Sequence, residues 1–365
     1  MTDNDSLMTN MTANARSAAR CLAGANDATK AAALLAAAAA LRASVADILE
    51  ANAQDVAAAV AAGISPAMLD RLKLDEGRIA VMASAVEQVA TLEDPVGQII
   101  DSRSRPNGLV MERVRVPVGV LGIIYESRPN VTADAAALGL RSGNAVILRG
   151  GSEAVHSNRA IHAAMVQGVT HAGLPADAVQ LVPTQDRAVV GAMLRAQGAI
   201  DMIIPRGGKS LVARVQDEAR VPVLAHLDGI CHSYVHKDAN PEMAQALVVN
   251  AKMRRTGICG ATETLLIDQD YPAPAAMISA LLDAGCEVRA DDILMELDAR
   301  TVSADADDWD TEYLDSVISA CVISGLDDAM AHIARHGSHH TDAIITQDAA
   351  AAARFLAEVD SAIVM

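Results

Sequence analysis

The chain has few aromatic and few basic residues. Only 2% of its residues are aromatic, and 29 Lys and Arg stand against 46 Asp and Glu, so the formal net charge is −17. Such a charge repels a phosphate backbone, and no basic stripe with interleaved aromatic residues is present to overcome that repulsion. The composition therefore argues against nucleic acid as a partner. It also implies that any anionic substrate is held by a local group of cations.

Paired cysteines and long apolar runs are also missing. The five cysteines form an odd, widely spaced set without a C-x-x-C pair, which disfavours a disulfide framework and a zinc or redox motif. The longest apolar run near the start, residues 31–41, is shorter than the roughly 20 residues that a membrane-spanning helix needs. These absences predict a protein of the reducing cytoplasm that has no membrane partner.

The period of the apolar residues predicts two α/β domains and an arm. An Ala-rich stretch, residues 13–63, leaves one apolar face and reads as amphipathic helices, whereas the alternation around Gly108 is typical of a hairpin. Elsewhere strands alternate with helices, including a strand expected in VPVLAHL, so we expect doubly wound parallel sheets. The expected divisions are residues 1–98 with 117–224 for the first domain, 99–116 for the hairpin arm and 225–365 for the second domain.

The segment NAKMRRTGICGATE, residues 250–263, carries the most distinctive candidate site. Cys259 stands between Gly257 and Gly260 before an expected strand, which leaves room for a substrate carbonyl beside the thiol and the backbone N–H groups. Upstream cations favour the reactive thiolate and are suited to binding a phosphate leaving group; they are Lys252, Arg254 and Arg255. A buried structural cysteine is the alternative interpretation.

A resemblance to a known family weighs in favour of catalysis. The segments PVGVLGIIYESRPNVTADAAALGLRSGNAVILRGGSEA, NAKMRRTGICGATETLL, IDMIIPRGGKSLV, VLAHLDGICHSYVHKDAN and HGSHHTDAIITQD resemble those of the γ-glutamyl phosphate reductase family, within the aldehyde dehydrogenase superfamily. The resemblance implies an aldehyde-dehydrogenase-like α/β fold: a doubly wound dinucleotide-binding domain, a second α/β domain that carries the cysteine, and a β-hairpin arm for oligomerisation. That family continues for some tens of residues beyond SAIVM, so the resemblance predicts that the natural protein is longer.

The resemblance also implies a reaction. Cys259 attacks L-glutamyl 5-phosphate, phosphate leaves, and NADPH reduces the resulting thioester to glutamate 5-semialdehyde, the second step of proline biosynthesis from glutamate. The implied partners are the small-molecule substrate, glutamate 5-kinase and further copies of the chain in a dimer or tetramer.

The expected cofactor residues follow three strands, because ligands of doubly wound sheets bind beyond the carboxyl ends of the strands. Arg149 is suited to gripping the 2′-phosphate of NADPH, and the PRGGKS turn is suited to a pyrophosphate. The chain has neither G-x-G-x-x-G nor a Walker sequence to support the turn further. The expected residues are Glu126, Ser127, Arg128, Pro129, Arg149, Gly150, Gly151, Ser152, Glu153, Pro205, Arg206, Gly207, Gly208 and Ser210.

Three further residues are expected near the reacting carbonyl. Ser127 and Asn130 are candidates to hold the oxyanion, with ordinary turn and helix-cap chemistry as the alternative for the turn. By resemblance, His226 occupies the position where general aldehyde dehydrogenases carry a glutamate base, and a satisfied histidine at a strand end is the alternative to a proton-transfer role. The residues expected to bind the substrate are Asn250, Lys252, Arg254, Arg255, Ser338 and His340.

A histidine-rich segment near the end of the chain suggests a metal site, but the spacing is wrong for zinc. Its histidines, His332, His336, His339 and His340, beside Asp342, match no standard zinc pattern, so we expect no metal. Two other functions remain open from the sequence: another acyl-reducing or aldehyde-oxidising dehydrogenase of the superfamily, and a non-catalytic assembly protein on the same fold.

Overall fold

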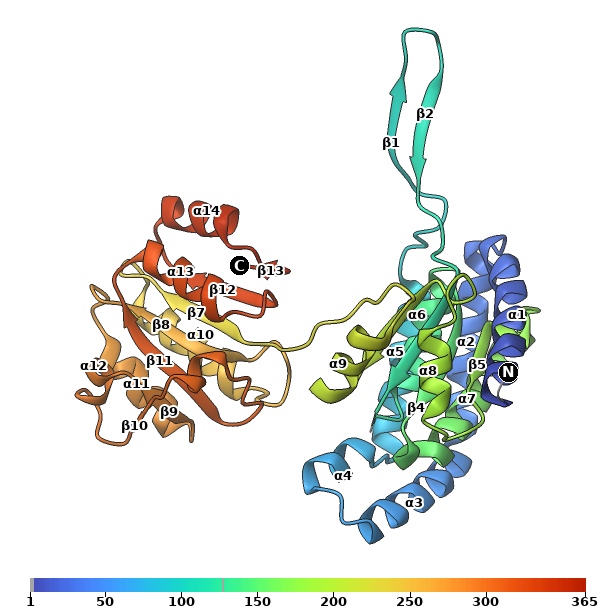
Figure 1. Cartoon of the computed structure of the whole chain (residues 1–365), viewed down its shortest axis with the longest axis horizontal. Helices are drawn as coiled ribbons and strands as arrows, with labels where there is room; N and C mark the ends of the chain where they lie inside the picture. The colour runs from blue at the N-terminus through green and yellow to red at the C-terminus, as the bar shows by residue number, and fades with distance from the viewer. Residues whose placement is uncertain (1–2, 127) are drawn as a thin grey trace. The chain divides into compact units, whose positions relative to one another are not determined.

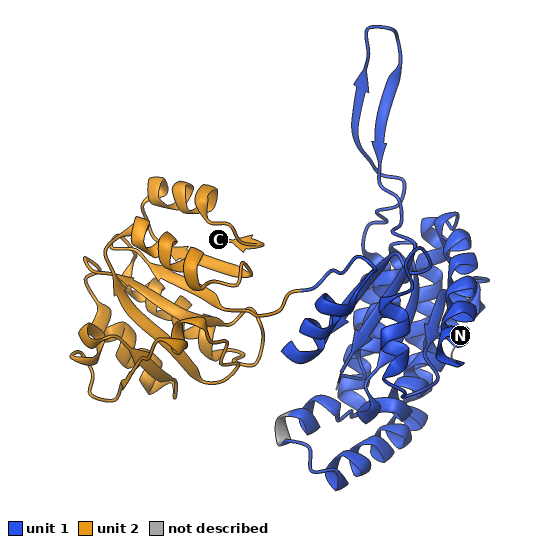
Figure 2. Cartoon of the chain, viewed as in Figure 1, with its two compact units in different colours: residues 1–225 blue, residues 226–365 orange. Residues whose placement is uncertain are grey.

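The computed structural model describes residues 3–126 and 128–365. The chain divides into two compact units, residues 1–225 and 226–365, which Figure 2 shows in separate colours. The division lies beside the boundary that the sequence places near Leu224. The fold class expected from the sequence is confirmed, because each unit is built on a parallel sheet with helices.

Unit 1 begins with helices, as the Ala-rich stretch predicts. Asn26 caps the second of them by accepting a hydrogen bond from the Thr29 N–H at 2.8 Å. This helix packs closely on a later one, since a Cβ on Gly168 would lie 2.2 Å from the Ala37 nitrogen. The opening helices are α1 (Asp3–Ala23), α2 (Asp27–Ala43), α3 (Val45–Ala61), α4 (Pro66–Leu72) and α5 (Glu76–Thr91).

The sheet of unit 1 is parallel, with strand order β5-β4-β3-β6. Its strands are β3 (Val120–Tyr125), β4 (Ala145–Gly150), β5 (Val179–Leu181) and β6 (Met202–Arg206). The connecting helices are α6 (Val131–Arg141), η1 (Ser152–Ala154), α7 (Val155–His171), η2 (Ala176–Ala178), α8 (Ala188–Leu194) and α9 (Lys209–Glu218). Both β3 and β4 are buried along their whole length, which explains their continuous apolar sequences.

One expected strand of unit 1 is wrong. In VPVLAHL, only Val223 forms a bridge, with Ile203, and the segment then leaves the sheet. The apolar residues of this segment are only partly used for burial, since Val221 is buried but Leu224 is 60% exposed. An apolar run of this length does not by itself distinguish a strand from an extended connection.

The hairpin arm forms as the sequence predicts. Strands β1 (Ile99–Ser104) and β2 (Val110–Val114) pair antiparallel around a turn in which Gly108 has φ +83°, a value that favours glycine. Figure 1 shows this ribbon extending away from the rest of unit 1. Its apolar side chains are exposed, among them Ile99, Ile100 and Val110.

Unit 2 is a wider parallel sheet with strand order β10-β9-β11-β8-β7-β12-β13. Successive residues of its central strand, β8, pack into cores on opposite faces of the sheet: Leu265 contributes to one core and Leu266 to the other. Its strands are β7 (Cys231–Val235), β8 (Thr262–Asp268), β9 (Glu287–Ala290), β10 (Val302–Ser303), β11 (Val317–Ile323), β12 (Thr341–Ile345) and β13 (Ile363–Val364). Its helices are α10 (Pro241–Met253), α11 (Pro274–Asp283), α12 (Asp292–Met295), η3 (Asp307–Asp310), α13 (Leu326–His336) and α14 (Ala349–Glu358).

Within the described residues, no single helix is long and apolar enough to cross a membrane. Helices α2 and α3 would pass that test only as a pair, and they are bent by 68° at the break between them.

Candidate active site

Cys259 lies in the loop that joins α10 to β8 in unit 2. Asn240 caps the start of α10 by accepting from the Met243 N–H at 3.0 Å, and Pro241 takes the first helical position. The helix ends at Met253, and residues 254–261 then lead into a strand that is buried throughout. The thiol-bearing residue is half-buried, so the fold presents it at a surface instead of enclosing it in a core.

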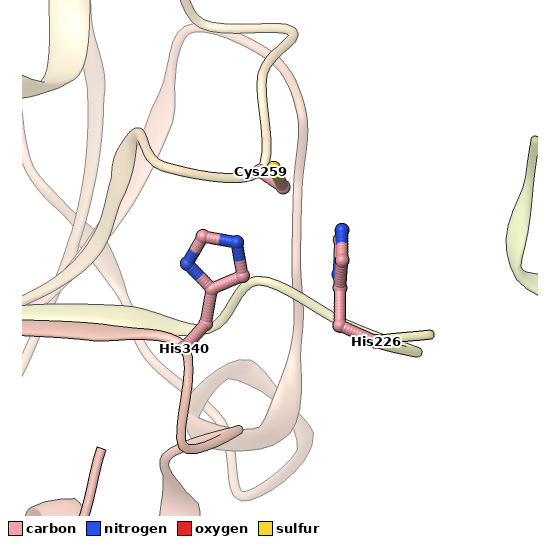
Figure 3. A group of neighbouring side chains, drawn as sticks. All are labelled: His226, Cys259 and His340. Carbon is pink, nitrogen blue, oxygen red and sulfur yellow. The ribbon is translucent and has the colours of Figure 1, made fainter. Parts of the chain in front are cut away.

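Two histidines accompany the thiol. His226 is the first residue of unit 2, and His340 directly precedes β12. The Sγ of Cys259 and one nitrogen of each imidazole all lie within 4.8 Å of one another. Figure 3 shows the two rings on one side of the cysteine, and the rings meet edge to face with centroids 4.9 Å apart. Three distant segments of the sequence therefore meet at one point.

The orientation of His340 is set by its neighbour. Its Nδ1 is 2.8 Å from the Thr341 hydroxyl, and the other ring nitrogen points toward Cys259 (Figure 3). Burial, with His226 as a smaller cause, lowers the pKa of His340 below its usual value. The ring is thus neutral near pH 7, and its Nε2 can accept a proton from the thiol.

The segment that precedes β7 packs against the backbone of the Cys259 loop. A Cβ on Gly229 would lie 2.1 Å from the Cys259 carbonyl oxygen, so only glycine permits this approach of two backbones. The Cys231 thiol also donates to that oxygen at 3.1 Å. Gly229 is fixed in turn by Glu312, which accepts from its N–H at 3.0 Å.

A buried ion pair joins α10 and β8, the two elements that flank the same loop. Lys252 is on the last turn of α10 and Glu263 is near the start of β8; their Nζ and Oε2 atoms are 2.5 Å apart, and both side chains are 0% exposed. Burial raises the pKa of Glu263 to about 7 although Lys252 opposes the rise. The structure therefore places Lys252 inside unit 2, paired with Glu263, and not at a surface where it would meet a phosphate.

The other residues expected to bind substrate are placed differently. Arg254, Arg255 and Asn250 are exposed on the end of α10 and the start of the loop. Ser338 accepts from the Ile230 N–H at 2.9 Å, which is a contact within the scaffold. Among the expected substrate residues, His340 lies beside Cys259, with one ring nitrogen within 4.8 Å of the thiol sulfur.

The histidine-rich segment does not gather around one point. His336 pairs with Asp310 at 2.8 Å, and His339 bonds to the Asp360 carbonyl at 2.5 Å. His332 packs against the rings of Trp309 and His336. In the described parts of the chain, His340 alone among these histidines belongs to a group with the geometry to hold a metal, and its companions are His226 and Cys259.

Six of the fourteen expected cofactor residues line a cleft of about 710 Å³ within unit 1. The cleft lies beyond the ends of β3 and β4, where the sheet topology places a ligand. The expected residues that line it are Glu126, Arg149, Gly151, Ser152, Glu153 and Ser210. Seven other expected cofactor residues do not line the cleft: Arg128, Pro129, Gly150, Pro205, Arg206, Gly207 and Gly208. Ser127 lies outside the described residues.

The glycine-rich turn before α9 already binds an anion. The Gly208 N–H, at the N-terminus of this helix, donates to the Glu126 carboxylate at 3.1 Å. A helix N-terminus attracts negative charge through its unpaired N–H groups and its dipole. In this structure a carboxylate of the same chain occupies the N–H of the turn, and pyrophosphate binding there stays a prediction.

Arg149 is partly committed to the scaffold. It is 9% exposed, and its Nη1 and Nη2 donate to the carbonyls of Gly150 and Gln185 at 3.0 and 3.2 Å. Its Nε is buried and has no hydrogen-bond partner among the residues that the structure describes. Arg187 and Arg214 line the same cleft, and sequence reasoning missed them because neither residue lies within an expected motif.

Asn130 contacts a residue of the helix that it precedes. It stands at the N-terminus of α6, where its side-chain amide donates to Asp134 at 2.8 Å. The amide donates to a side chain and accepts from no backbone N–H of the helix, so this contact is not a helix cap, and the oxyanion role stays a prediction.

The model of the aldehyde dehydrogenase family matches residues 2–296, most of the chain. The chain belongs to the aldehyde dehydrogenase family. It is therefore an oxidoreductase by family, as the resemblance predicts.

Among curated members of the aldehyde dehydrogenase family, similarity is high to γ-glutamyl phosphate reductases. The enzyme of Sphingopyxis alaskensis is 68% identical over 98% of this chain and 84% of its own length. That of Novosphingobium aromaticivorans is 67% identical over 96% of this chain and 83% of its own length.

Solved structures agree with this placement in the aldehyde dehydrogenase family. The γ-glutamyl phosphate reductase of Thermotoga maritima is 38% identical, with a TM-score of 0.94 over 98% of this chain and 87% of that one. An acetylating aldehyde dehydrogenase of Geobacillus thermoglucosidasius, at 16% identity and a TM-score of 0.69, shares the fold over 99% of this chain and 86% of that one.

Proposed function

We propose that this protein reduces L-glutamyl 5-phosphate to L-glutamate 5-semialdehyde and phosphate with NADPH, the second step of proline biosynthesis from glutamate. One observation carries the proposal. In a chain 68% identical to a γ-glutamyl phosphate reductase, a half-exposed Cys259 stands in a glycine-flanked loop, with His340 facing it.

The first step is acyl transfer to the thiol. Cys259 gives its proton to the Nε2 of His340, and its sulfur attacks the acyl carbon of the substrate. The acyl carbon–oxygen bond then breaks, phosphate leaves with the bonding electron pair, and a thioester remains on Cys259. Arg254 and Arg255 are exposed at the end of α10 and are the cations best placed within unit 2 to bind the departing phosphate.

The second step needs a hydride, which a bound nicotinamide dinucleotide supplies. The cleft of unit 1 supports this cofactor, because its volume of about 710 Å³ suits a ligand of that size class and three arginines line it. Arg149, Arg187 and Arg214 would hold the extra phosphate of NADPH. The N-terminus of α9 would hold the pyrophosphate once Glu126 is displaced from the Gly208 N–H.

The imidazoles beside the thiol suit a reductase. His226 stands, by resemblance, where general aldehyde dehydrogenases place a glutamate that activates water, and in this structure it joins His340 beside Cys259. A thioester that must wait for hydride is protected when no strong base polarises a water next to it. His226 or His340 can then return a proton as the thiohemiacetal collapses to aldehyde and thiol.

The setting follows from the same chemistry. The five cysteines are all free, and a catalytic thiol survives in a reducing cytoplasm. An acyl phosphate must be made by a kinase that phosphorylates a carboxylate, which is the role of a glutamate 5-kinase. The exposed apolar side chains of the β1–β2 arm support homo-oligomerisation through that ribbon.

The reverse reaction tests the proposal, because the acyl phosphate is itself labile. The purified chain is mixed with glutamate 5-semialdehyde, NADP⁺ and phosphate, and NADPH formation is followed by absorbance. We expect turnover that requires phosphate and that strongly prefers this aldehyde to simple aliphatic ones. Reduction of NADP⁺ that proceeds equally well without phosphate would instead indicate an aldehyde-oxidising dehydrogenase, and no turnover with any aldehyde would favour an assembly protein.

A further inference from the structure

Cys259, His226 and His340 bring one sulfur and two imidazole nitrogens together at a partly open surface of unit 2. We infer that these three side chains form a binding site for Zn²⁺, and that zinc bound there blocks the thiol and inhibits the enzyme reversibly. The binding stands on the geometry alone, whereas the inhibition rests on the proposed function of Cys259. The metal is an inhibitor here and not a cofactor.

The distances fit a zinc site after a small closure. Zinc bonds of about 2.3 Å to sulfur and about 2.0–2.1 Å to nitrogen place tetrahedral ligand atoms roughly 3.3–3.6 Å from one another. The three atoms here lie within 4.8 Å of one another. His226 is exposed, so rotation of its side chain can supply the remaining ångström or so without disturbing a packed core.

The donor set selects the metal. One thiolate and two imidazoles suit Zn²⁺, and they disfavour Mg²⁺ and Ca²⁺, which prefer oxygen ligands. His340 is oriented for the purpose, since its Nδ1 contacts the Thr341 hydroxyl and its other nitrogen faces the thiol (Figure 3). Binding replaces the S–H proton of Cys259 by the metal, and that proton passes to solvent.

A second cluster in unit 2 must be distinguished from this one. His236, Asp238 and Asp348 also bring a nitrogen and two carboxylate oxygens within 4.8 Å of one another. They offer no sulfur, so cobalt bound there lacks the spectroscopic signature of a thiolate ligand. The two clusters are therefore separable by spectroscopy as well as by mutation.

Cobalt titration of the intact, chelator-treated chain tests the site without relying on turnover. Co²⁺ bound to Cys259 is expected to produce a thiolate-to-metal charge-transfer band in the near ultraviolet at one equivalent, and added Zn²⁺ is expected to abolish it. Cys259→Ser should remove the band, and His226→Ala or His340→Ala should weaken cobalt binding by more than about tenfold, since even outer-shell partners of a metal contribute that much.

Two variants serve as matched controls. His339→Asn removes an exposed imidazole next to His340, and asparagine tolerates the positive φ of 57° at that position. His236→Ala disables the second cluster. Both should keep the charge-transfer band, and the fluorescence of Trp309, the single tryptophan, verifies that unit 2 is folded in every variant.

Inhibition is measured separately, in the reverse reaction. Zn²⁺ is expected to inhibit competitively against the aldehyde, with full recovery after chelation. The absence of a thiolate band in the parent chain overturns the proposal, as does a band that persists unweakened in both His226→Ala and His340→Ala. A band in a chain that shows no turnover would support the metal site while refuting the proposed function.

Discussion

Lys252→Met removes one half of the fully buried ion pair next to the loop that carries Cys259. The Lys252 ammonium lies 2.5 Å from the Glu263 carboxylate, and neither side chain is exposed. Methionine has a similar length, so the substitution removes the charge with little loss of volume. It leaves a buried carboxylate whose main opposite charge is gone.

The expected cost is about 3–5 kcal/mol of the free energy of unfolding of unit 2 at pH 8, the range found when one partner of a buried pair is removed. The cost depends on pH. Burial already raises the pKa of Glu263 to about 7, and the loss of Lys252 raises it further. A carboxyl group whose pKa is higher in the folded than in the unfolded protein stabilises the fold at pH values below its unfolded pKa of about 4.3. This stabilisation is lost as the pH rises through the folded pKa. The deficit of the variant should therefore be smaller at pH 5.5 than at pH 8.

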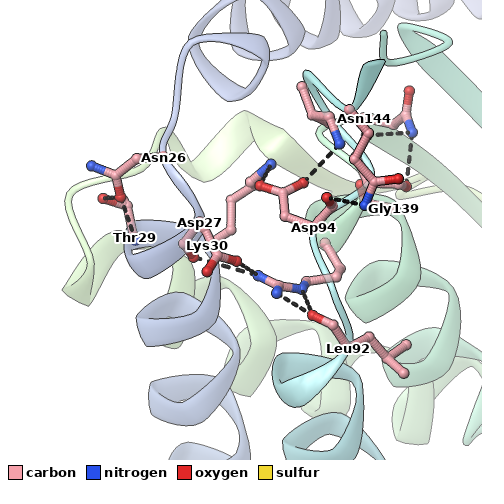
Figure 4. Close-up of polar contacts among 12 residues, drawn as sticks. Asn26, Asp27, Thr29, Lys30, Leu92, Asp94, Gly139 and Asn144 are labelled. Atoms are coloured by element: carbon pink, nitrogen blue, oxygen red, sulfur yellow. Dashed lines mark hydrogen bonds and ion pairs between the residues drawn. The ribbon is translucent and has the colours of Figure 1, made fainter. Parts of the chain in front are cut away.

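The single tryptophan makes the measurement specific. Trp309 packs against a core of unit 2, so its fluorescence in a urea titration follows that unit, while far-ultraviolet circular dichroism follows the whole chain. Lys30→Met is a matched control in unit 1. Lys30 is likewise 0% exposed and pairs with Asp94 at 2.6 Å, and Figure 4 shows its side chain directed toward that carboxylate. That variant should shift the dichroism transition and leave the Trp309 transition in place.

A double variant completes the test. Lys252→Met with Glu263→Leu removes both charges, and it should recover most of the lost stability, because buried pairs replaced by apolar residues are often neutral or stabilising. The account of this ion pair is wrong if Lys252→Met lowers the stability of unit 2 by less than about 1 kcal/mol at pH 8. It is also wrong if the deficit is the same at both pH values.

Three further substitutions test the site. Cys259→Ser should lower turnover at least about a thousandfold while NADPH still binds, with Cys21→Ser, a change at an exposed cysteine of α1, as the control. Activity within tenfold of the parent would refute the covalent mechanism. Arg149→Ala should weaken the binding of NADPH about tenfold or more and that of NADH less, as measured by fluorescence titration. Arg159→Ala, at a residue that does not line the cleft, should affect the binding of neither cofactor. Equal losses for both cofactors would move the phosphate contact to another arginine. Gly229→Ala should lower both turnover and the unfolding midpoint followed by Trp309 fluorescence, since the new Cβ would lie 2.1 Å from the Cys259 carbonyl oxygen. Parent-like values of both quantities would contradict the close approach of the two backbones.

Much of the architecture is determined by the sequence alone. Alternation of apolar strands with helices predicts both sheets, because a buried parallel strand and an amphipathic helix impose different periods on the chain. The hairpin is equally local, since Gly108 and the alternating residues around it set its turn and register. Cys259 is also singled out locally, because Gly257 and Gly260 flank it in the sequence, and its catalytic role stays a prediction.

Tertiary structure decided what depends on distant segments. Nothing near Cys259 in the sequence announces His226 or His340, which are 33 and 81 residues away and meet the thiol only where the loops of β7, β8 and β12 come together. The charge of Lys252 suggested a phosphate ligand, yet the fold buries it against Glu263, 11 residues later. Sequence patterns report residues that are near along the chain or repeat at a regular period, whereas a site made by neighbouring strands of a parallel sheet joins residues that share neither property.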